Sequence, residues 1–133
     1  MSKAMITYGE FIDDLIKHFP ELKEEVLDED YKNLISLQVG VLKRYTQQAI
    51  NDRDTELIKK CFDFVADNVN RVEFKVENSL YLTFLNKLDF SKNLSAKKLL
   101  SNDLKRAHKE LQEYDRGAEK NEKLQAFLKT LDT

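Results

Sequence analysis

Hydrophobic positions are densest in the segment from Val72 to Phe90, which reads VEFKVENSLYLTFLNKLDF. Its apolar side chains occupy most of a helical circumference, whereas a surface helix carries only one apolar stripe. We therefore predict a central helix over residues 72–90 that is buried nearly all round. The side chains expected to be most buried there are Val76, Leu80, Tyr81, Phe84, Leu85 and Leu88.

Helical spacing of apolar residues also predicts amphipathic helices before this segment. Thr7 and Glu10 have the spacing of a capping box, so a first helix should begin there and end before Pro20. Asn70 and Glu73 have the same spacing and should start the central helix. The other helices predicted in this part of the chain cover residues 21–27, 31–50 and 55–70.

The last third of the chain should contain two further helices. Ser95 is a suitable N-cap for a helix over residues 96–116, and Gly117 is placed as its C-cap. From Glu119 onward the apolar stripe points in a different direction, so we expect a separate helix. This divides the chain into a helical domain over residues 1–116 and a C-terminal helix over residues 117–133. That helix should be peripheral, or should contact another copy of the chain in a homodimer.

Composition supports one helical domain. The chain has 133 residues, 41% of them hydrophobic, which is enough for a core. Only three glycines and one proline are present, fewer than the turns of an all-β fold need. We therefore predict an all-α fold, a compact multi-helix domain of short-linked helical hairpins around the central helix, arranged as a bundle or as a short helix-pair solenoid.

Three features indicate a cytoplasmic protein without a membrane segment. Cys61 is the single cysteine, which excludes an internal disulfide framework. No apolar run approaches the roughly 18 residues of a membrane span. The start of the chain, MSKAMITYGEF, lacks the apolar region of a signal peptide.

Charge is unevenly distributed although the net charge is only −2. Residues 1–30 carry nine acidic residues against three basic ones, and residues 91–116 carry seven basic residues against four acidic ones. Solvated helix faces are the simplest explanation of such runs. The alternative is that the acidic part attracts a basic partner protein. The candidate partner surface consists of Glu21, Glu24, Glu25 and Asp28.

The predicted helix over residues 96–116 has a basic face around its narrow apolar stripe. Nucleic acid is one ligand that could use such a face. However, no aromatic residues interleave with the basic ones, and no helix-turn-helix spacing is present, so weak nucleic-acid binding is only an alternative to solvated lysines. The residues of this basic face are Lys97, Lys98, Lys105, Arg106 and Lys109.

Polar residues interrupt two of the apolar faces. Gln38 lies in the middle of the apolar face of the helix over residues 31–50, and Glu77 lies within the apolar arc of the central helix, next to Asn78. A buried polar group without a partner costs about 1 to 3 kcal/mol. We therefore predict that these three residues, with Tyr45 or Tyr81, form a hydrogen-bonded network that fixes how the helices pack. The functional alternative is a polar pocket for a small ligand.

Signals of catalysis are weak. His18 and His108 have no neighbours at metal-ligand spacing, and Cys61 lies on an apolar face, where cysteine usually serves as a small hydrophobic residue. Ser95 and Lys98 match a Ser-x-x-Lys pattern, but the other motifs of that enzyme class are missing. There is no glycine-rich phosphate loop. We expect no enzyme activity, no cofactor and no metal site.

Two stretches resemble a known family. The sequence LQVGVLKRYTQQAINDRDTELIKKCFDFVADN, followed by VENSLYLTFLNKLDF, is similar to uncharacterised, stand-alone bacterial helical domains. The resemblance covers about residues 8–115. It implies no established activity, and immunity-like or regulatory roles are associated with it only loosely. The matching residues are Leu37, Gln38, Gly40, Leu42, Arg44, Tyr45, Thr46, Cys61, Phe62, Phe64, Val76, Glu77, Asn78, Leu80 and Tyr81.

These observations favour a non-catalytic helical module that binds another protein, of an immunity or regulatory type. Its first rival is a small-ligand sensor that uses a polar pocket between helices. Its second rival is the weak nucleic-acid binder described above.

Overall fold

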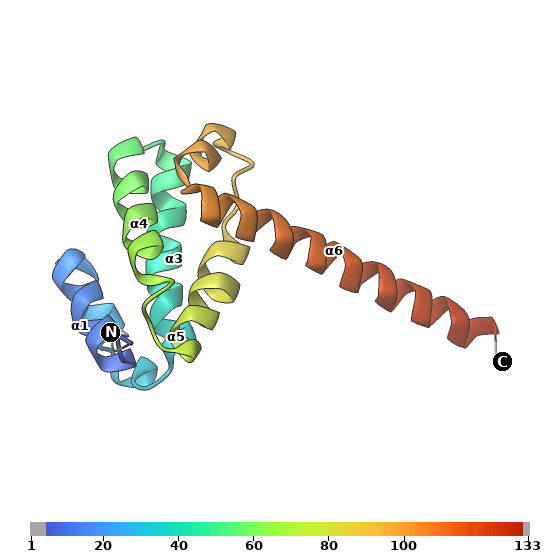
Figure 1. Ribbon diagram of the computed structural model, residues 1–133, viewed down its shortest axis with the longest axis horizontal. Coiled ribbons are helices and arrows are strands. Elements are labelled where there is room, and N and C mark those ends of the chain that lie inside the picture. The colour runs from blue at the N-terminus through green and yellow to red at the C-terminus, as the bar shows by residue number, and fades with distance from the viewer. Residues whose placement is uncertain (1–4, 132–133) are drawn as a thin grey trace.

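The computed structural model describes the backbone of residues 5–131 and the side chains of residues 5–117. Its longer helices confirm the predicted all-α fold (Figure 1). The only strand-like pairing in this part of the chain is an isolated bridge between Ile6 and Val72. None of the described helices is long and apolar enough to cross a membrane. The α-helices of at least six residues are α1 (Tyr8–His18), α3 (Ile35–Asp52), α4 (Thr55–Asn68), α5 (Phe74–Ser79) and α6 (Asn102–Leu131).

Short helical turns connect or extend these helices. Between α1 and α3 lie η1 (Pro20–Leu22), α2 (Lys23–Val26) and η2 (Glu29–Tyr31). The chain after α5 continues through η3 (Leu80–Phe84), η4 (Leu85–Lys87) and η5 (Leu94–Leu99).

The capping box predicted at the start of α1 is present. The Thr7 hydroxyl accepts a hydrogen bond from the Glu10 amide at 3.2 Å, and the Glu10 carboxylate accepts one from the Thr7 amide at 3.3 Å. The helix ends at His18, and Pro20 occupies the first position of η1, where a missing amide hydrogen costs nothing. Both ends of the first helix therefore follow the sequence signals.

The long helix α3 begins at Ile35, four positions after its predicted start. Asn33 has a left-handed backbone, with φ of 63°, and this interrupts the helical conformation. The residues before it form η2, which Asp28 caps by accepting a hydrogen bond from the Asp30 amide at 2.8 Å. At the other end, Arg53 is left-handed and Asp54 caps α4, so the two helices form a tight hairpin.

The segment predicted as a central helix packs against α3 and lies beside α6 (Figure 1). It is helical from Phe74 to Lys87, although η3 is a π-helical turn and η4 a 3-10 turn. Buried positions recur every four residues, which on an ideal α-helix would drift by about 40° per step. The wider π-turn offsets this drift and keeps them on one side. The positions with this spacing are Val76, Leu80, Phe84 and Leu88, of which the first three are fully buried. Leu85, next to Phe84, is fully buried as well.

The prediction that this segment is buried on all sides was wrong. Phe74 is 76% exposed and Leu82 is 44% exposed, and Tyr81 is only half-buried. One face of the helix is open because no other described element covers it completely.

The capping box predicted at Asn70 and Glu73 is also wrong. Glu73 is the N-cap residue of α5, but its side chain makes no capping hydrogen bond. Its carboxylate instead accepts a hydrogen bond from the Tyr8 amide at 2.8 Å, because Ile6 pairs with the chain on either side of Val72. The glutamate therefore fastens the start of α1 to the connection between α4 and α5.

The C-terminal third differs most from its prediction. Residues around Ser95 form the 3-10 helix η5, and Ser101 rather than Ser95 caps α6 by accepting a hydrogen bond from the Leu104 amide at 3.2 Å. This shift lets Leu100 and Leu104 enter the core, with 4% and 1% exposure. Gly117 does not end the helix, since α6 is continuous to Leu131.

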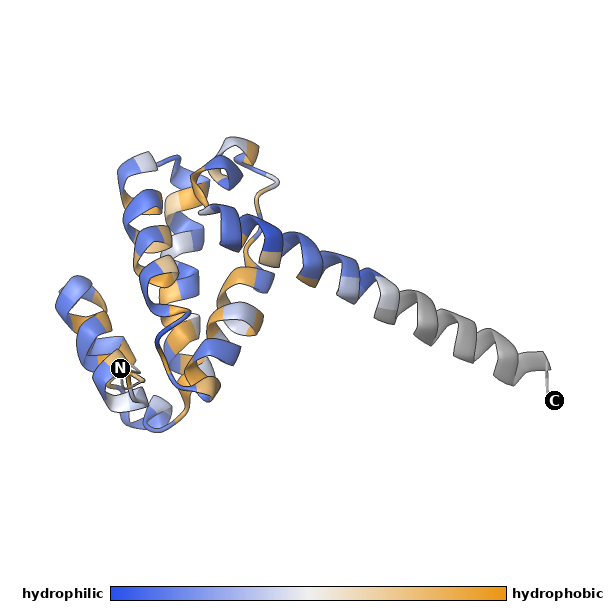
Figure 2. Cartoon of the chain, in the orientation of Figure 1, coloured by the Kyte–Doolittle hydropathy of each residue, from blue (hydrophilic) through white to orange (hydrophobic). Residues whose placement is uncertain are grey.

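The helix α6 extends away from the packed helices (Figure 1). In the extending part, the residues up to Gly117 are mostly hydrophilic (Figure 2). The apolar stripe predicted beyond Glu119 lies outside the residues whose side chains are described. A homodimer through this helix therefore stays a prediction.

Candidate functional site

Gln38 is buried, as predicted, with 3% of its surface exposed. Its side-chain oxygen accepts a hydrogen bond from the Tyr8 hydroxyl, and its Nε2 donates to the Val26 carbonyl at 2.9 Å. Both ends of the amide are therefore satisfied by α1 and α2. Burial raises the pKa of Tyr8.

The predicted network of Gln38 with Glu77 and Asn78 does not form, because Tyr8 and Val26 already occupy the Gln38 amide. Glu77 is half-buried and Asn78 is exposed. Tyr45 lies elsewhere and donates from its hydroxyl to Glu21 at 3.1 Å. Burial and the Glu21 carboxylate raise the pKa of Tyr45 to about 12. The ligand pocket proposed for these residues therefore has no geometric basis.

Asn78 and Tyr81 instead face α6 across a groove of about 520 Å³. Burial raises the pKa of Tyr81, and the carboxylates of Glu77 and Asp103 raise it further. The groove is largely apolar, and Leu82 and Tyr114 on its walls are exposed. Its other lining residues are Ala107, Glu110 and Leu111.

The predicted acidic partner surface lies on η1, α2 and the turn that follows. Leu22 and Val26 anchor this segment in the core, and their spacing of four residues turns the residues between them towards solvent. The carboxylates that are exposed here are Glu21, Glu24, Glu25 and Asp28.

Three of these four carboxylates have local partners. Glu21 accepts from Tyr45, Glu25 pairs with Arg44, and Asp28 caps η2. The Glu25 and Arg44 side chains are each about half exposed, and such surface pairs contribute about 0 to 1 kcal/mol. These contacts hold the side chains on the surface without neutralising the excess of negative charge.

Leu27 is the unusual residue of this surface, because it is 49% exposed among carboxylates. It lines a hollow of about 510 Å³ together with two acidic side chains. The remaining lining residues are Pro20, Glu21, Lys23 and Glu24. Leu27 was not among the predicted site residues. It lies outside the four-residue spacing of Leu22 and Val26, and this position could have indicated that it is exposed.

Four of the five predicted basic-face residues meet at one hollow of about 430 Å³ between η5 and α6. Lys97 and Lys98 come from η5, and Lys105 and Lys109 come from α6. Arg106 is exposed and lies outside the lining. The residues that sequence analysis missed at this hollow are Leu100, His108, Gln112 and Arg116.

His108 contributes the most buried polar side chain of this hollow, with 8% exposure. Its ring lies 5.4 Å from the ring of Phe90, edge to face, and the Lys97 ammonium lies 5.8 Å from the centre of the same phenyl ring. Burial and the positive charge of Lys97 both lower the pKa of His108. The imidazole is therefore neutral near pH 7.

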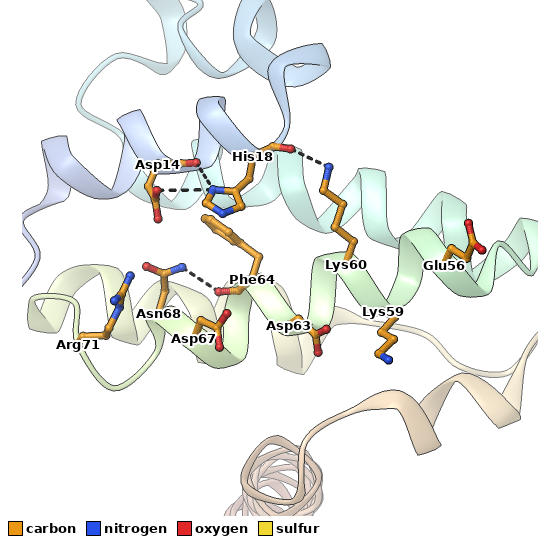
Figure 3. A pocket seen from close by; sticks show the side chains of 10 residues that line it. All are labelled: Asp14, His18, Glu56, Lys59, Lys60, Asp63, Phe64, Asp67, Asn68 and Arg71. Carbon is orange, nitrogen blue, oxygen red and sulfur yellow. Dashed lines mark hydrogen bonds and ion pairs between the residues drawn. The ribbon is translucent and has the colours of Figure 1, made fainter.

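A larger hollow, of about 560 Å³, is lined by residues of both α1 and α4 (Figure 3). His18 and Phe64 lie with ring centres 5.1 Å apart, and the Lys60 ammonium donates to the His18 carbonyl at 2.8 Å. A cation is favourable at this C-terminal end of α1. The charges around this hollow are mixed, because Asp14, Glu56, Asp63 and Asp67 line it together with Lys59, Lys60 and Arg71.

Asn68 lies beside this hollow and is 98% buried, since only 2% of it is exposed. Its Nδ2 donates to the Phe64 carbonyl at 2.8 Å, which fixes the orientation of the amide. The Oδ1 atom has no partner among the described residues, and it has almost no surface through which a ligand in the hollow could reach it. These contacts indicate that Asn68 has a structural role where α1 and α4 meet.

Cys61 is fully buried on α4, in agreement with the interpretation as a small hydrophobic residue. Burial raises the pKa of its thiol to about 11, while the Thr46 side chain and Lys60 oppose this rise. A thiol with such a pKa is protonated near pH 7 and is a poor nucleophile. Among the described residues, no group of three or more His, Cys, Asp or Glu side chains could hold a metal ion.

Comparison with known proteins gives one match. A family model described as a domain of unknown function, DUF7674, matches residues 12–116. Neither the curated proteins nor the solved structures include a significant match.

Proposed function

We propose a protein-binding function for this chain, which belongs to the DUF7674 family of domains of unknown function. The contact surface is the acidic surface formed by Glu21, Glu24, Glu25 and Asp28. Its partner is a basic protein, and the function is that of an immunity-type inhibitor or a regulator rather than of an enzyme.

The observation that carries this proposal is the half-exposed Leu27 surrounded by carboxylates. Residues 20–31 contain six acidic residues and one lysine, and all seven side chains are exposed. Such a charge excess does not stabilise a fold, because like charges repel one another. It does attract a partner of opposite charge and raises the association rate.

An apolar side chain in the middle of a charged surface gives a bound partner something to bury. Leu34 and Leu37, at the start of α3, are 50% and 44% exposed as well. Larger exposed apolar patches rimmed by polar residues are typical of protein contacts. The combination favours a protein partner over a small cation.

The test compares the wild-type protein with a variant in which the charges are removed but the oxygen acceptors stay. The variant carries Glu21→Gln, Glu24→Gln, Glu25→Gln and Asp28→Asn. Each amide oxygen can still accept the hydrogen bonds that Tyr45, Arg44 and the Asp30 amide donate. Loss of binding would therefore reflect charge and not unfolding.

The matched control removes four charges from exposed positions on α4 and α6. It carries Glu56→Gln, Asp63→Asn, Asp67→Asn and Glu113→Gln. All three proteins are immobilised and exposed to an extract of the native cells. We expect a basic protein that binds the wild type and the control but not the acidic-surface variant. Equal recovery of every captured protein on all three would overturn the proposal.

A further inference from the structure

We propose that the basic hollow between η5 and α6 binds a compact phosphate compound that carries a pyrophosphate group, either free or as part of a nucleotide. This site shares no lining residue with the hollow at Leu27 on the acidic surface. The inference does not depend on the proposed protein partner.

The charged side chains that line this hollow all have the same sign. Five cationic side chains line the hollow, and no carboxylate does so among the residues that the structure describes. The hollow between α1 and α4 is different, because carboxylates alternate there with its lysines. The cations that line the basic hollow are Lys97, Lys98, Lys105, Lys109 and Arg116.

These five cations have no carboxylate partner among the side chains that the structure describes. Lys105 and Lys109 are one helical turn apart on α6, where like charges destabilise a helix. A bound anion would remove this repulsion, so the arrangement fits a ligand better than it fits the empty fold.

Three of the uncharged lining residues are held in place by packing or by a hydrogen bond. Leu100 and His108 are both buried, and the edge-to-face contact with Phe90 holds the imidazole. Gln112 is fixed by its hydrogen bond from Nε2 to the Asn86 side-chain oxygen at 3.1 Å. The flexible lysine heads therefore surround a fixed floor from two different elements.

The charge and the size of the hollow indicate which kind of ligand it binds. Pyrophosphate carries several negative charges on a compact group, which suits five cations around about 430 Å³. Single-stranded nucleic acid is usually held by bases stacked on aromatic side chains. No Phe, Tyr or Trp is among the described lining residues, so the phosphates rather than a base should be recognised.

The test measures binding of inorganic pyrophosphate by titration calorimetry at low salt. The site variant is Lys98→Glu with Lys109→Glu, which reverses one charge on each wall. The control is Lys17→Glu with Lys32→Glu, at two exposed positions outside the hollow. We expect the site variant to bind roughly tenfold more weakly or worse, and the control to stay within about twofold of the wild type. Circular dichroism verifies that both variants are folded.

The titration of His108 reports binding at the hollow itself, which nonspecific electrostatic binding elsewhere on the protein would not affect. A bound anion should raise the pKa of His108 in the wild type and in the control, as followed by the NMR shifts of its ring protons over pH. The site variant should show no pyrophosphate-dependent change. An unchanged His108 titration in the wild type, or equal weakening in both variants, would overturn the proposal.

Two further ligands identify the source of the phosphate. Binding of ATP with the same affinity as pyrophosphate indicates that only the phosphates are recognised, and tighter binding of ATP indicates a nucleotide ligand. A DNA duplex of random sequence is the third arm. If the duplex binds and pyrophosphate does not, the hollow is part of a nucleic-acid surface and the proposal is wrong.

Discussion

Gln38 joins three elements because its amide has both a donor and an acceptor. The Tyr8 hydroxyl of α1 donates to it, and it donates to the last residue of α2 from its place on α3. With these two hydrogen bonds, both the oxygen and the nitrogen of the buried amide have a partner. Residues of this kind determine how helices pack, because any other register would lose both hydrogen bonds.

Replacement of Gln38 by Leu should reduce the free energy of unfolding by about 1 to 3 kcal/mol, because the Tyr8 hydroxyl and the Val26 carbonyl lose their partner. Urea denaturation measures this loss. Glu77→Ala is the control, and at this half-buried position its effect should be within about 0.5 kcal/mol. If Glu77→Ala cost as much as Gln38→Leu, Glu77 would have a buried partner after all.

Cys61 should make stability depend on alkaline pH. The pKa of its thiol is about 11 in the fold against 9.0 for an unperturbed cysteine, so the unfolded chain loses its proton first. The contribution is complete below pH 9 and is lost as pH rises through 11. Urea denaturation between pH 8 and pH 11 should show this decline, and Cys61→Ala should make it shallower. A decline of equal slope in Cys61→Ala would show that other groups cause it.

At the scale of elements, the boundaries depend on which polar residue caps a helix. Ser95 and Ser101 both precede apolar positions with helical spacing, so local sequence does not distinguish them. Ser101 is selected because a start at Asn102 brings Leu100 and Leu104 into the core. Gly117 was interpreted as a helix end, but inside a helix glycine costs only about 1 kcal/mol relative to alanine. The helix continues through it.

Ser101→Ala should therefore reduce the free energy of unfolding by about 1 kcal/mol, since α6 loses its N-cap. Ser95→Ala is the matched control. Its hydroxyl donates only to the nearby Asn93 side chain, at 2.8 Å, and its loss should cost less. Thermal unfolding of the two variants gives the comparison. The larger loss in Ser95→Ala would place the helix start where sequence analysis expected it.

At the scale of the whole molecule, sequence patterns predicted the all-α fold and most of its core, because burial follows apolar periodicity. They did not predict the partners of Gln38, since Tyr8 lies 30 positions away and nothing in the local sequence connects the two. The acidic and basic regions were visible as charge runs. The exposed Leu27 and the hollow around the lysines required the three-dimensional arrangement.

The central claim is that the acidic surface attracts a basic partner protein. Its most direct test is the association rate of the captured partner at different salt concentrations. The Debye length falls from about 30 Å at 0.01 M to about 10 Å at 0.1 M, so the rate for the wild type should fall over this range. The variant with amides at Glu21, Glu24, Glu25 and Asp28 should associate more slowly and show little salt dependence. A wild-type rate that does not change with salt, or a variant with the same salt dependence, would contradict the claim.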